Sequence, residues 1–221
     1  MAGFAQVLVS GLLSGGIYGL VSVGLTLIFG VLKVVNFAHG DFLMVSMYLA
    51  YWLFTFLSID PYLGAILAIP IMFLFGALVQ RLLMKPILEA PHVVQIFATM
   101  GLSLILQNAA LLLFKADFRN VRTPYAKSVF EIGSIRLSVP HVVAFVVAMG
   151  AAILLYTFVQ TTDMGKAMRA VSQNSRAAKL MGINVDRVHM IAYSLGIALV
   201  GLAGVLLTPI YPIYPTVGLN F

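Results

Sequence analysis

Residues 165–182 read GKAMRAVSQNSRAAKLMG and form a polar, basic segment between two long apolar runs of the chain. Because charged side chains are costly at the centre of a bilayer, we expect this segment to lie outside the membrane, between two spanning helices. Asn174 or Ser175 can cap the start of a short helix within it, and Gly182 can end that helix. The segment indicates a docking surface, and a solvated loop that touches anionic lipid fits its composition equally well.

The composition is that of a polytopic membrane protein. Of 221 residues, 62% are apolar and only 9% are charged, whereas soluble domains are about 45–50% apolar and about 25% charged. The mean hydropathy is +1.05, and the length suggests a single transmembrane domain, 1–221. The net charge of +6 comes from loops between apolar runs, where Lys and Arg set topology and meet membrane lipid, so it does not indicate a nucleic-acid partner.

The apolar runs predict an all-α polytopic membrane protein with about six transmembrane helices, each needing about 20 residues. The runs lie at 4–32, 42–57, 62–83, 93–114, 141–159 and 189–207. The first is too long for one straight span, so its helix tilts or leaves the bilayer at one end. We expect Pro70 to kink the third helix, and Arg81, Lys85 and Glu89 to lie in the loop after it.

Glycines recur at helical spacing in the first run and are frequent in the last. Gly11, Gly15 and Gly19 fall on one face of a helix, and such a ridge allows a neighbouring helix to pack closely in lipid; simple glycine richness is the alternative. The last run favours close packing through Gly196, Gly201 and Gly204.

The longer polar loop at 115–140 contains a possible small hairpin. Residues 129–137 alternate apolar and polar around Gly133 and Ser134, a pattern typical of two short paired strands. A lone hairpin of this size is only marginally stable in water.

Residues 33–42 crowd Asn36, His39 and Asp41 between two apolar runs. Asp41 suits the N-terminus of the second helix because of the helix dipole. One interpretation is a broken helix that lines a translocation pathway, since irregular backbone at membrane depth survives only inside protein or beside water. The other is an ordinary polar turn.

The fourth run carries polar side chains that cost energy when they face lipid, so we expect them to face protein or a pore. These further candidate pathway residues are Gln95, Thr99, Gln107 and Asn108.

Motifs for catalysis and for nucleotide binding are missing from the sequence. There is no phosphate loop, no His-Glu-x-x-His and no Gly-x-Ser-x-Gly, so neither an enzyme nor a cofactor or metal site is indicated. There is also no cysteine. The predicted spans hold no buried Asp, Glu, Lys or Arg, whereas proton-coupled carriers usually need such groups at membrane depth. We therefore expect energy to be supplied from elsewhere.

The sequence resembles the permease subunits of bacterial ABC importers for branched-chain amino acids, of the LivH type. The residues that carry the resemblance are GLTLIFGV at 24–31, NFAHGDF at 36–42, GKAMRA at 165–170, and Ala177 and Ala178 through Gly182. The similarity extends along the whole chain.

The resemblance implies that residues 160–188 form a cytoplasmic loop that couples the permease to an ATPase. Importer permeases commonly carry Glu-Ala-Ala-x-x-x-Gly in this loop, and here Arg176 stands in place of the Glu. A basic contact to an acidic or helix-C-terminal surface of the ATPase is the natural substitute. The coupling residues that we expect are Gly165, Arg169, Arg176, Ala177, Ala178 and Gly182.

The resemblance further implies a multi-pass protein of the bacterial inner (plasma) membrane that works with a second permease subunit, two cytoplasmic ATPase subunits and a periplasmic substrate-binding protein. Family members usually continue for further spans, so we expect the chain to lack its C-terminal part. Within the family, an amide or urea permease is the alternative. Outside it, the alternative is a secondary transporter or channel that needs no ATPase.

A cytoplasmic 165–182 segment fixes the side of every other loop by alternation. It places eight of the 13 Lys and Arg residues inside and five outside, in mild agreement with the positive-inside rule. The inner set is Lys33, Arg81, Lys85, Lys166, Arg169, Arg176, Lys179 and Arg187.

Overall fold

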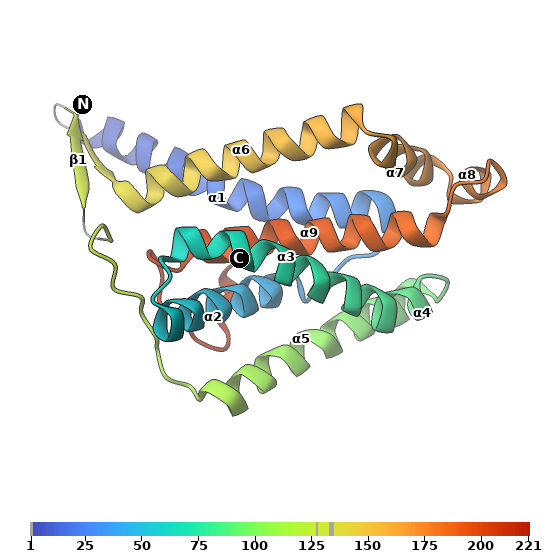
Figure 1. The fold of residues 1–221 in the computed structure, drawn as a ribbon, viewed down its shortest axis with the longest axis horizontal. Coiled ribbons are helices and arrows are strands. Elements are labelled where there is room, and N and C mark those ends of the chain that lie inside the picture. The colour runs from blue at the N-terminus through green and yellow to red at the C-terminus, as the bar shows by residue number, and fades with distance from the viewer. Residues whose placement is uncertain (1, 127, 133–134) are drawn as a thin grey trace.

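The computed structural model describes residues 2–126, 128–132 and 135–221 and consists mainly of long helices (Figure 1). Six of its helices are long and apolar enough to cross a membrane, which confirms the all-α polytopic prediction. They are α1 (Ala2–Leu32), α2 (His39–Leu57), α3 (Pro61–Val79) with its continuation to Ile87, α5 (His92–Phe114), α6 (Val139–Thr161) and α9 (Val185–Leu207).

Helix α9 is the central helix of the bundle. In its most apolar window 78% of the residues are buried, against 11% in α5 and in α6. It packs against α1, α2 and α3 and runs between them in Figure 1. The core therefore forms around the last spanning segment of the chain, while α5 and α6 leave most of their surface for lipid or for other proteins.

Glycines bring α9 close to its neighbours, as the sequence predicts. A Cβ on Gly196 would lie 2.8 Å from the carbonyl oxygen of Gly24 on α1, and a Cβ on Gly201 would lie 2.7 Å from the Met72 side chain on α3. In contrast, a Cβ on Gly11, Gly15 or Gly19 would meet nothing within 4 Å. Within the described part of the chain, that ridge of α1 has no packing partner.

The third helix is longer than predicted, because α3 continues without a break into η1 (Gln80–Met84), a π-helix, and then into α4 (Lys85–Ile87). Arg81 and Lys85 are therefore helical, and their expected place in a loop is wrong. Long unbranched side chains there favour helix, and the Lys85 Nζ atom lies 2.6 Å from an Asp186 carboxylate oxygen at the start of α9. Pro70 lies inside α3 without ending it.

The predicted hairpin is present, with β1 (Val129–Ile132) antiparallel to β2 (Ile135–Ser138). Its anchor is Gln6 near the start of α1, whose side chain both donates to the Arg136 carbonyl (2.8 Å) and accepts from the Arg136 N–H (2.7 Å). Because α1 is 31 residues long, about 46 Å at 1.5 Å per residue, it exceeds a hydrocarbon core of about 30 Å and can reach the hairpin.

The bundle thus has two different ends. The hairpin end carries β1, β2 and the loop that follows α5. The other end, called the coupling end after the role predicted for residues 160–188, carries α4 and the two short helices α7 (Asp163–Gln173) and α8 (Ser175–Leu180) between α6 and α9 (Figure 1).

Candidate functional site

The segment between α1 and α2 turns back into the bundle. Lys33 has a positive φ of 59° directly after α1, and residues 33–36 are non-helical. His39 Nε2 lies 3.0 Å from the Val21 carbonyl oxygen, and Val21 is about 16 Å along the α1 axis from its end at Leu32, at 1.5 Å per residue. Helix α2 therefore begins deep inside the bundle and not at its edge.

A second segment returns from the hairpin end to the same point. After α9 ends at Leu207, the chain leads to a short 3-10 helix, η2 (Val217–Asn220), that packs on α2. The backbones of Gly40 and Gly218 touch, and a Cβ on Gly218 would lie 2.9 Å from the Asp41 nitrogen. The non-spanning segment after α9 thus meets the first turn of α2, directly after segment 33–38, and only glycine permits this approach.

The start of α2 also corrects one expectation from the sequence. His39 and Asp41 lie inside the spanning helix and are 5% and 2% exposed, so the prediction that the spans hold no buried acidic or basic side chain is wrong for Asp41. The helix begins earlier than its apolar run because Asn36 forms the turn before it: the Asn36 side chain accepts from the Ala38 N–H (3.2 Å), and its carbonyl accepts from the His39 N–H (3.2 Å).

Polar contacts hold the returning segment 33–38 between α9 and α5. The buried Asn36 amide donates to the Tyr193 hydroxyl on α9 at 3.2 Å. The Thr99 hydroxyl on α5 lies 3.4 Å from the Val35 carbonyl oxygen and donates to the Gln95 and Ile96 carbonyls of its own helix. The structure therefore brings Asn36, His39 and Thr99 together at one level of the bundle.

Asp41 joins α2 to α5. Its carboxylate accepts from the Gln107 amide at 2.9 Å, and the same amide contacts the Ser103 hydroxyl at 3.1 Å. Among the described residues, no Lys, Arg or His nitrogen lies within 4.0 Å of this carboxylate. The helix dipole at the start of α2 favours the negative charge.

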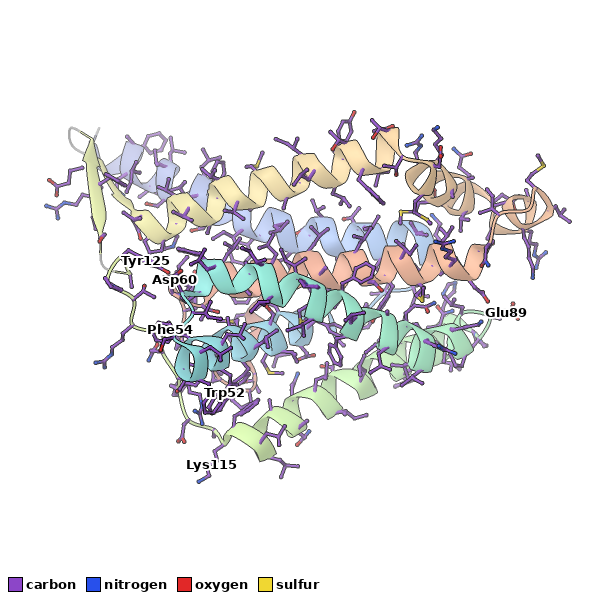
Figure 2. The ribbon with its side chains drawn as sticks, viewed as in Figure 1. Trp52, Phe54, Asp60, Glu89, Lys115 and Tyr125 are labelled. Atoms are coloured by element: carbon purple, nitrogen blue, oxygen red, sulfur yellow. The ribbon has the colours of Figure 1, made fainter. Side chains whose placement is uncertain are left out.

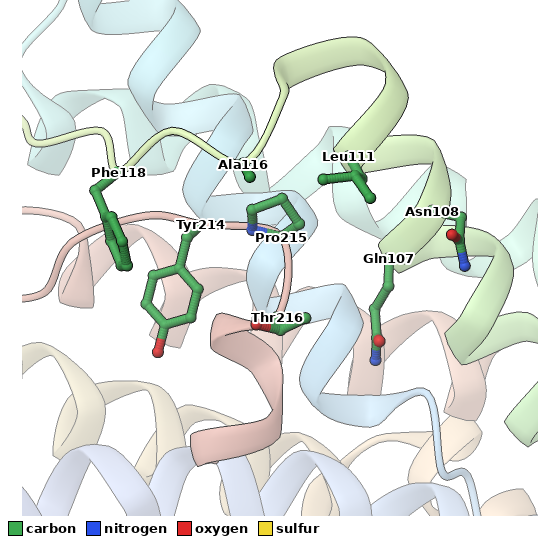
Figure 3. Close-up of a pocket in the computed structure, with 8 residues that line it drawn as sticks. All are labelled: Gln107, Asn108, Leu111, Ala116, Phe118, Tyr214, Pro215 and Thr216. Atoms are coloured by element: carbon green, nitrogen blue, oxygen red, sulfur yellow. The ribbon is translucent and has the colours of Figure 1, made fainter.

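Gln107 also forms part of the wall of a cavity of about 350 Å³ between α5 and the segment that follows α9 (Figure 3). The residues that line the cavity are Gln107, Asn108, Leu111, Ala116, Phe118, Tyr214, Pro215 and Thr216. The sequence points to Gln107 and Asn108, but not to the members at 214–216. A tail without helical or strand periodicity gives no signal of where it folds back.

Gln95 lies apart from this cluster, towards the coupling end. Its amide donates to the carbonyls of Ile87, Leu88 and Ala90, each at 3.1 Å, and so holds the turn between α4 and α5. Asn108 is exposed and donates to the Leu104 carbonyl at 2.8 Å.

The coupling segment consists of two capped helices. The Thr162 hydroxyl accepts from the Gly165 N–H at the start of α7, and the Asn174 side chain accepts from the Ala177 N–H at the start of α8, both at 3.0 Å. Gly182, with φ 84°, follows the end of α8. The predicted cap at Asn174 and stop at Gly182 are therefore confirmed.

Helix α7 rests on the end of α6. Met168 and Val171 are buried, and a Cβ on Gly165 would lie 2.6 Å from the Phe158 carbonyl oxygen, so this position needs glycine. The Arg169 guanidinium donates to the Val159 carbonyl, which places it against the negative end of the α6 dipole. Arg169 thus faces the bundle.

Helix α8 projects beyond the spanning helices (Figure 1). Ala178 is buried, but Arg176 and Ala177 are exposed. The apolar side chains of Leu180 and Met181 are 88% and 83% exposed, a feature that the sequence analysis did not single out. This tip combines positive charge with uncovered apolar area outside any spanning segment.

At the hairpin end, polar and aromatic contacts fix the loop after α5. The Tyr125 hydroxyl lies 2.8 and 2.7 Å from the two oxygens of Asp60 (Figure 2), the residue that caps α3. Burial, together with the hydrogen bond to Asp60, raises the pKa of the Tyr125 hydroxyl. The Arg119 guanidinium lies over the rings of Tyr51 and Trp52, at 5.3 and 5.2 Å from their centroids.

A bundle of apolar helices with polar, non-spanning segments at its centre defines a multi-pass membrane transport protein. Residues 7–221 match the family model described as "Branched-chain amino acid transport system / permease component", and the chain belongs to this family. No solved structure matches the chain.

Curated relatives agree with the family. The chain is 29% identical to the high-affinity branched-chain amino acid transport system permease protein LivH of Salmonella typhimurium, over 94% of this chain and 71% of LivH. It is 28% identical to LivH of Escherichia coli K12 over the same shares. Identity to the permease protein BraD of Pseudomonas aeruginosa is 26%, over 92% of this chain and 70% of BraD. The chain is thus a transport component of the inner membrane and not an enzyme.

Proposed function

We propose that this chain forms a translocation pathway for branched-chain or related amino acids in an ATP-driven importer. The observation that carries the proposal is the contact of the non-spanning segment after α9 with the first turn of α2, at Gly218 and Gly40, beside the buried Asp41. Irregular backbone and a carboxylate are costly in lipid and are found in membrane proteins where a substrate or ion passes. The family membership supports the transport of branched-chain amino acids.

The proposed pathway enters at the cavity beside Gln107 and passes Asp41 at the start of α2. Segment 33–38 closes it towards the coupling end, held by the bonds of Asn36 to Tyr193 and of Thr99 near Val35. Opening towards the coupling end then requires this segment, whose backbone is not part of a spanning helix, to move.

The proposed partners are a second permease subunit, two cytoplasmic ATPase subunits and a periplasmic binding protein. In this scheme α8 contacts the ATPase through Arg176 and the exposed Leu180 and Met181, while α7 passes the motion to α6 and α1, on which it packs. The negatively charged Glu that importers commonly carry is replaced by Arg176, so an acidic or helix-C-terminal surface of the ATPase is the matching site.

The buried Asp41 also favours a second candidate, a secondary transporter that couples uptake to protons. The two candidates are separated by reconstituting the protein in proteoliposomes with its expected partners and measuring uptake of radiolabelled leucine. We expect uptake that requires both the ATPase and internal ATP. Uptake driven by an imposed proton gradient, with the ATPase left out, would contradict the importer and support the secondary transporter.

A further inference from the structure

Asp41 is a buried carboxylate without a positive partner. It is 2% exposed, and the side chains that hydrogen-bond to it among the described residues, Gln107 and Ser103, are both neutral. Burying an ion without a counter-charge is costly, and the dipole at the start of α2 offsets only part of this cost. The site is therefore suited to a positively charged group that arrives from outside.

The cavity on the other side of Gln107 offers the remaining features of an amino-acid site. Its volume of about 350 Å³ falls in the range of small-molecule sites, roughly 300–1,000 Å³. The Asn108 amide and the Thr216 hydroxyl provide hydrogen-bond donors, while Leu111 and Phe118 provide apolar surface (Figure 3). Polar groups and apolar walls are thus separated within one small volume.

We propose that this cavity is a substrate subsite in which Asp41 and Gln107 bind the α-ammonium group of a zwitterionic amino acid. The ammonium group replaces the Gln107 N–H at the Asp41 carboxylate, and the Gln107 amide keeps its bond to Ser103 and turns its oxygen to the substrate. Asn108 and Thr216 face the substrate carboxylate, and the apolar side chain contacts Leu111 and Phe118. The inference rests on the proposed function.

The ammonium group is the best match because it restores the balance of charge and of donors at Asp41. It brings a full positive charge and three N–H donors, and charge-assisted hydrogen bonds are about twice as strong as neutral ones. A neutral amide or urea would leave the carboxylate without a counter-charge. The subsite therefore selects amino acids over the amides and urea that other members of such a family could carry.

The test is equilibrium binding of radiolabelled leucine to the permease–ATPase complex in nanodiscs, without the binding protein. Two competitors divide leucine into its parts: 3-methylbutylamine keeps the ammonium group and 4-methylpentanoate keeps the carboxylate. We expect the amine to compete and the acid to be weaker. In Asp41→Asn, the affinity for leucine should fall by at least about tenfold, because a hydrogen bond to a charged group is lost. The amine should then no longer compete.

Glu131→Gln is the matched control, since it neutralises an exposed carboxylate on the hairpin, away from the cavity, and its change should leave binding as in the unchanged protein. If Asp41→Asn does not fold, Thr216→Val decides, with Thr157→Val on the exposed face of α6 as its control. If leucine binds Thr216→Val and Asp41→Asn as tightly as it binds the unchanged protein, the proposed subsite is wrong, even where ATP-driven uptake is intact. Absence of ATP-driven uptake in the unchanged protein overturns the proposed function itself.

Discussion

Tyr125 shows how one side chain fixes a long loop at the residue scale. Its hydroxyl reaches both oxygens of Asp60, and its ring stacks on Tyr62 with centroids 5.2 Å apart. Asp60 also caps α3 by accepting from the Tyr62 N–H at 2.9 Å. The loop after α5 and the start of α3 are therefore held by the same carboxylate.

Tyr125→Phe should lower the free energy of unfolding by about 1–3 kcal/mol, because it removes one of the two donors of a partly buried carboxylate. The raised pKa of Tyr125 means that the folded state favours the neutral hydroxyl. The contribution of the Tyr125 hydroxyl to the free energy of unfolding is therefore fully present below the ordinary Tyr pKa of about 10 and is lost as the pH rises above that value. Thermal unfolding in detergent at pH 7, 9 and 11 measures this.

Tyr156→Phe is the control, because Tyr156 is 65% exposed on α6 and its hydroxyl should contribute little. Equal unfolding temperatures for Tyr125→Phe and the unchanged protein at pH 7 would show that the Asp60 contact does not hold the loop.

Single residues also mark the limit of what local sequence can predict. Asn36, His39 and Asp41 stand out as a polar group between apolar runs. Their depth depends on Val21, Tyr193 and Gln107, partners far away in the sequence, and no local pattern encodes such pairing. The polar group was therefore predictable, and its burial inside a span was not.

At the scale of elements, α7 and α8 also have some features that the local sequence predicts and others that it does not. Their caps follow from local chemistry, since Asn174 and Gly182 act within a few residues of themselves. The direction of the Arg169 side chain does not follow from local chemistry, because it depends on where the C-terminal end of α6 lies. Two basic residues of one predicted coupling segment thus receive different roles, Arg169 positioning α7 and Arg176 facing outward.

Arg176→Glu should weaken association with the ATPase, because it reverses the charge of an exposed side chain on the projecting helix. We expect at least about a fivefold loss of co-purified ATPase, roughly 1 kcal/mol, and a matching loss of ATP-driven uptake. Arg169→Glu should instead loosen α7 from α6 and uncouple ATP hydrolysis from uptake while much of the association remains.

Arg122→Glu, the same change at an exposed residue of the hairpin end, should leave the ATPase bound. Full transport by the double variant with Glu at 169 and 176 would exclude α7 and α8 as the coupling element.

On the scale of the whole molecule, contacts between segments far apart in the sequence show which loops lie together at each end of the bundle. Lys85 on α4 pairs with Asp186 on α9, and Gln6 on α1 binds Arg136 on β2. Alternation of the apolar runs predicts this grouping, and the packing agrees with it. The return of residues 208–221 to α2 could not be predicted, since that segment has neither periodicity nor charge.

Sidedness can be measured directly, because the chain has no cysteine. Ser175→Cys places one thiol at the start of α8 and Ser128→Cys places one before the hairpin, both at exposed positions. In intact cells a membrane-impermeant maleimide should label Ser128→Cys and spare Ser175→Cys, which should react only after the membrane is opened. The reverse pattern would place the coupling end outside and remove the basis for an ATPase partner.

The contact of Gly40 with Gly218 joins the first turn of α2 directly to the segment after α9. Residues 214–216 form a wall of the cavity, residues 33–38 lead into α2, and the backbones of Gly40 and Gly218 touch without a side chain between them. Such a backbone contact allows little independent movement, because no flexible side chain can absorb a displacement. Movement of the segment after α9 therefore shifts the start of α2, so in the proposed pathway the two mouths would be linked mechanically and would need no separate signal to alternate.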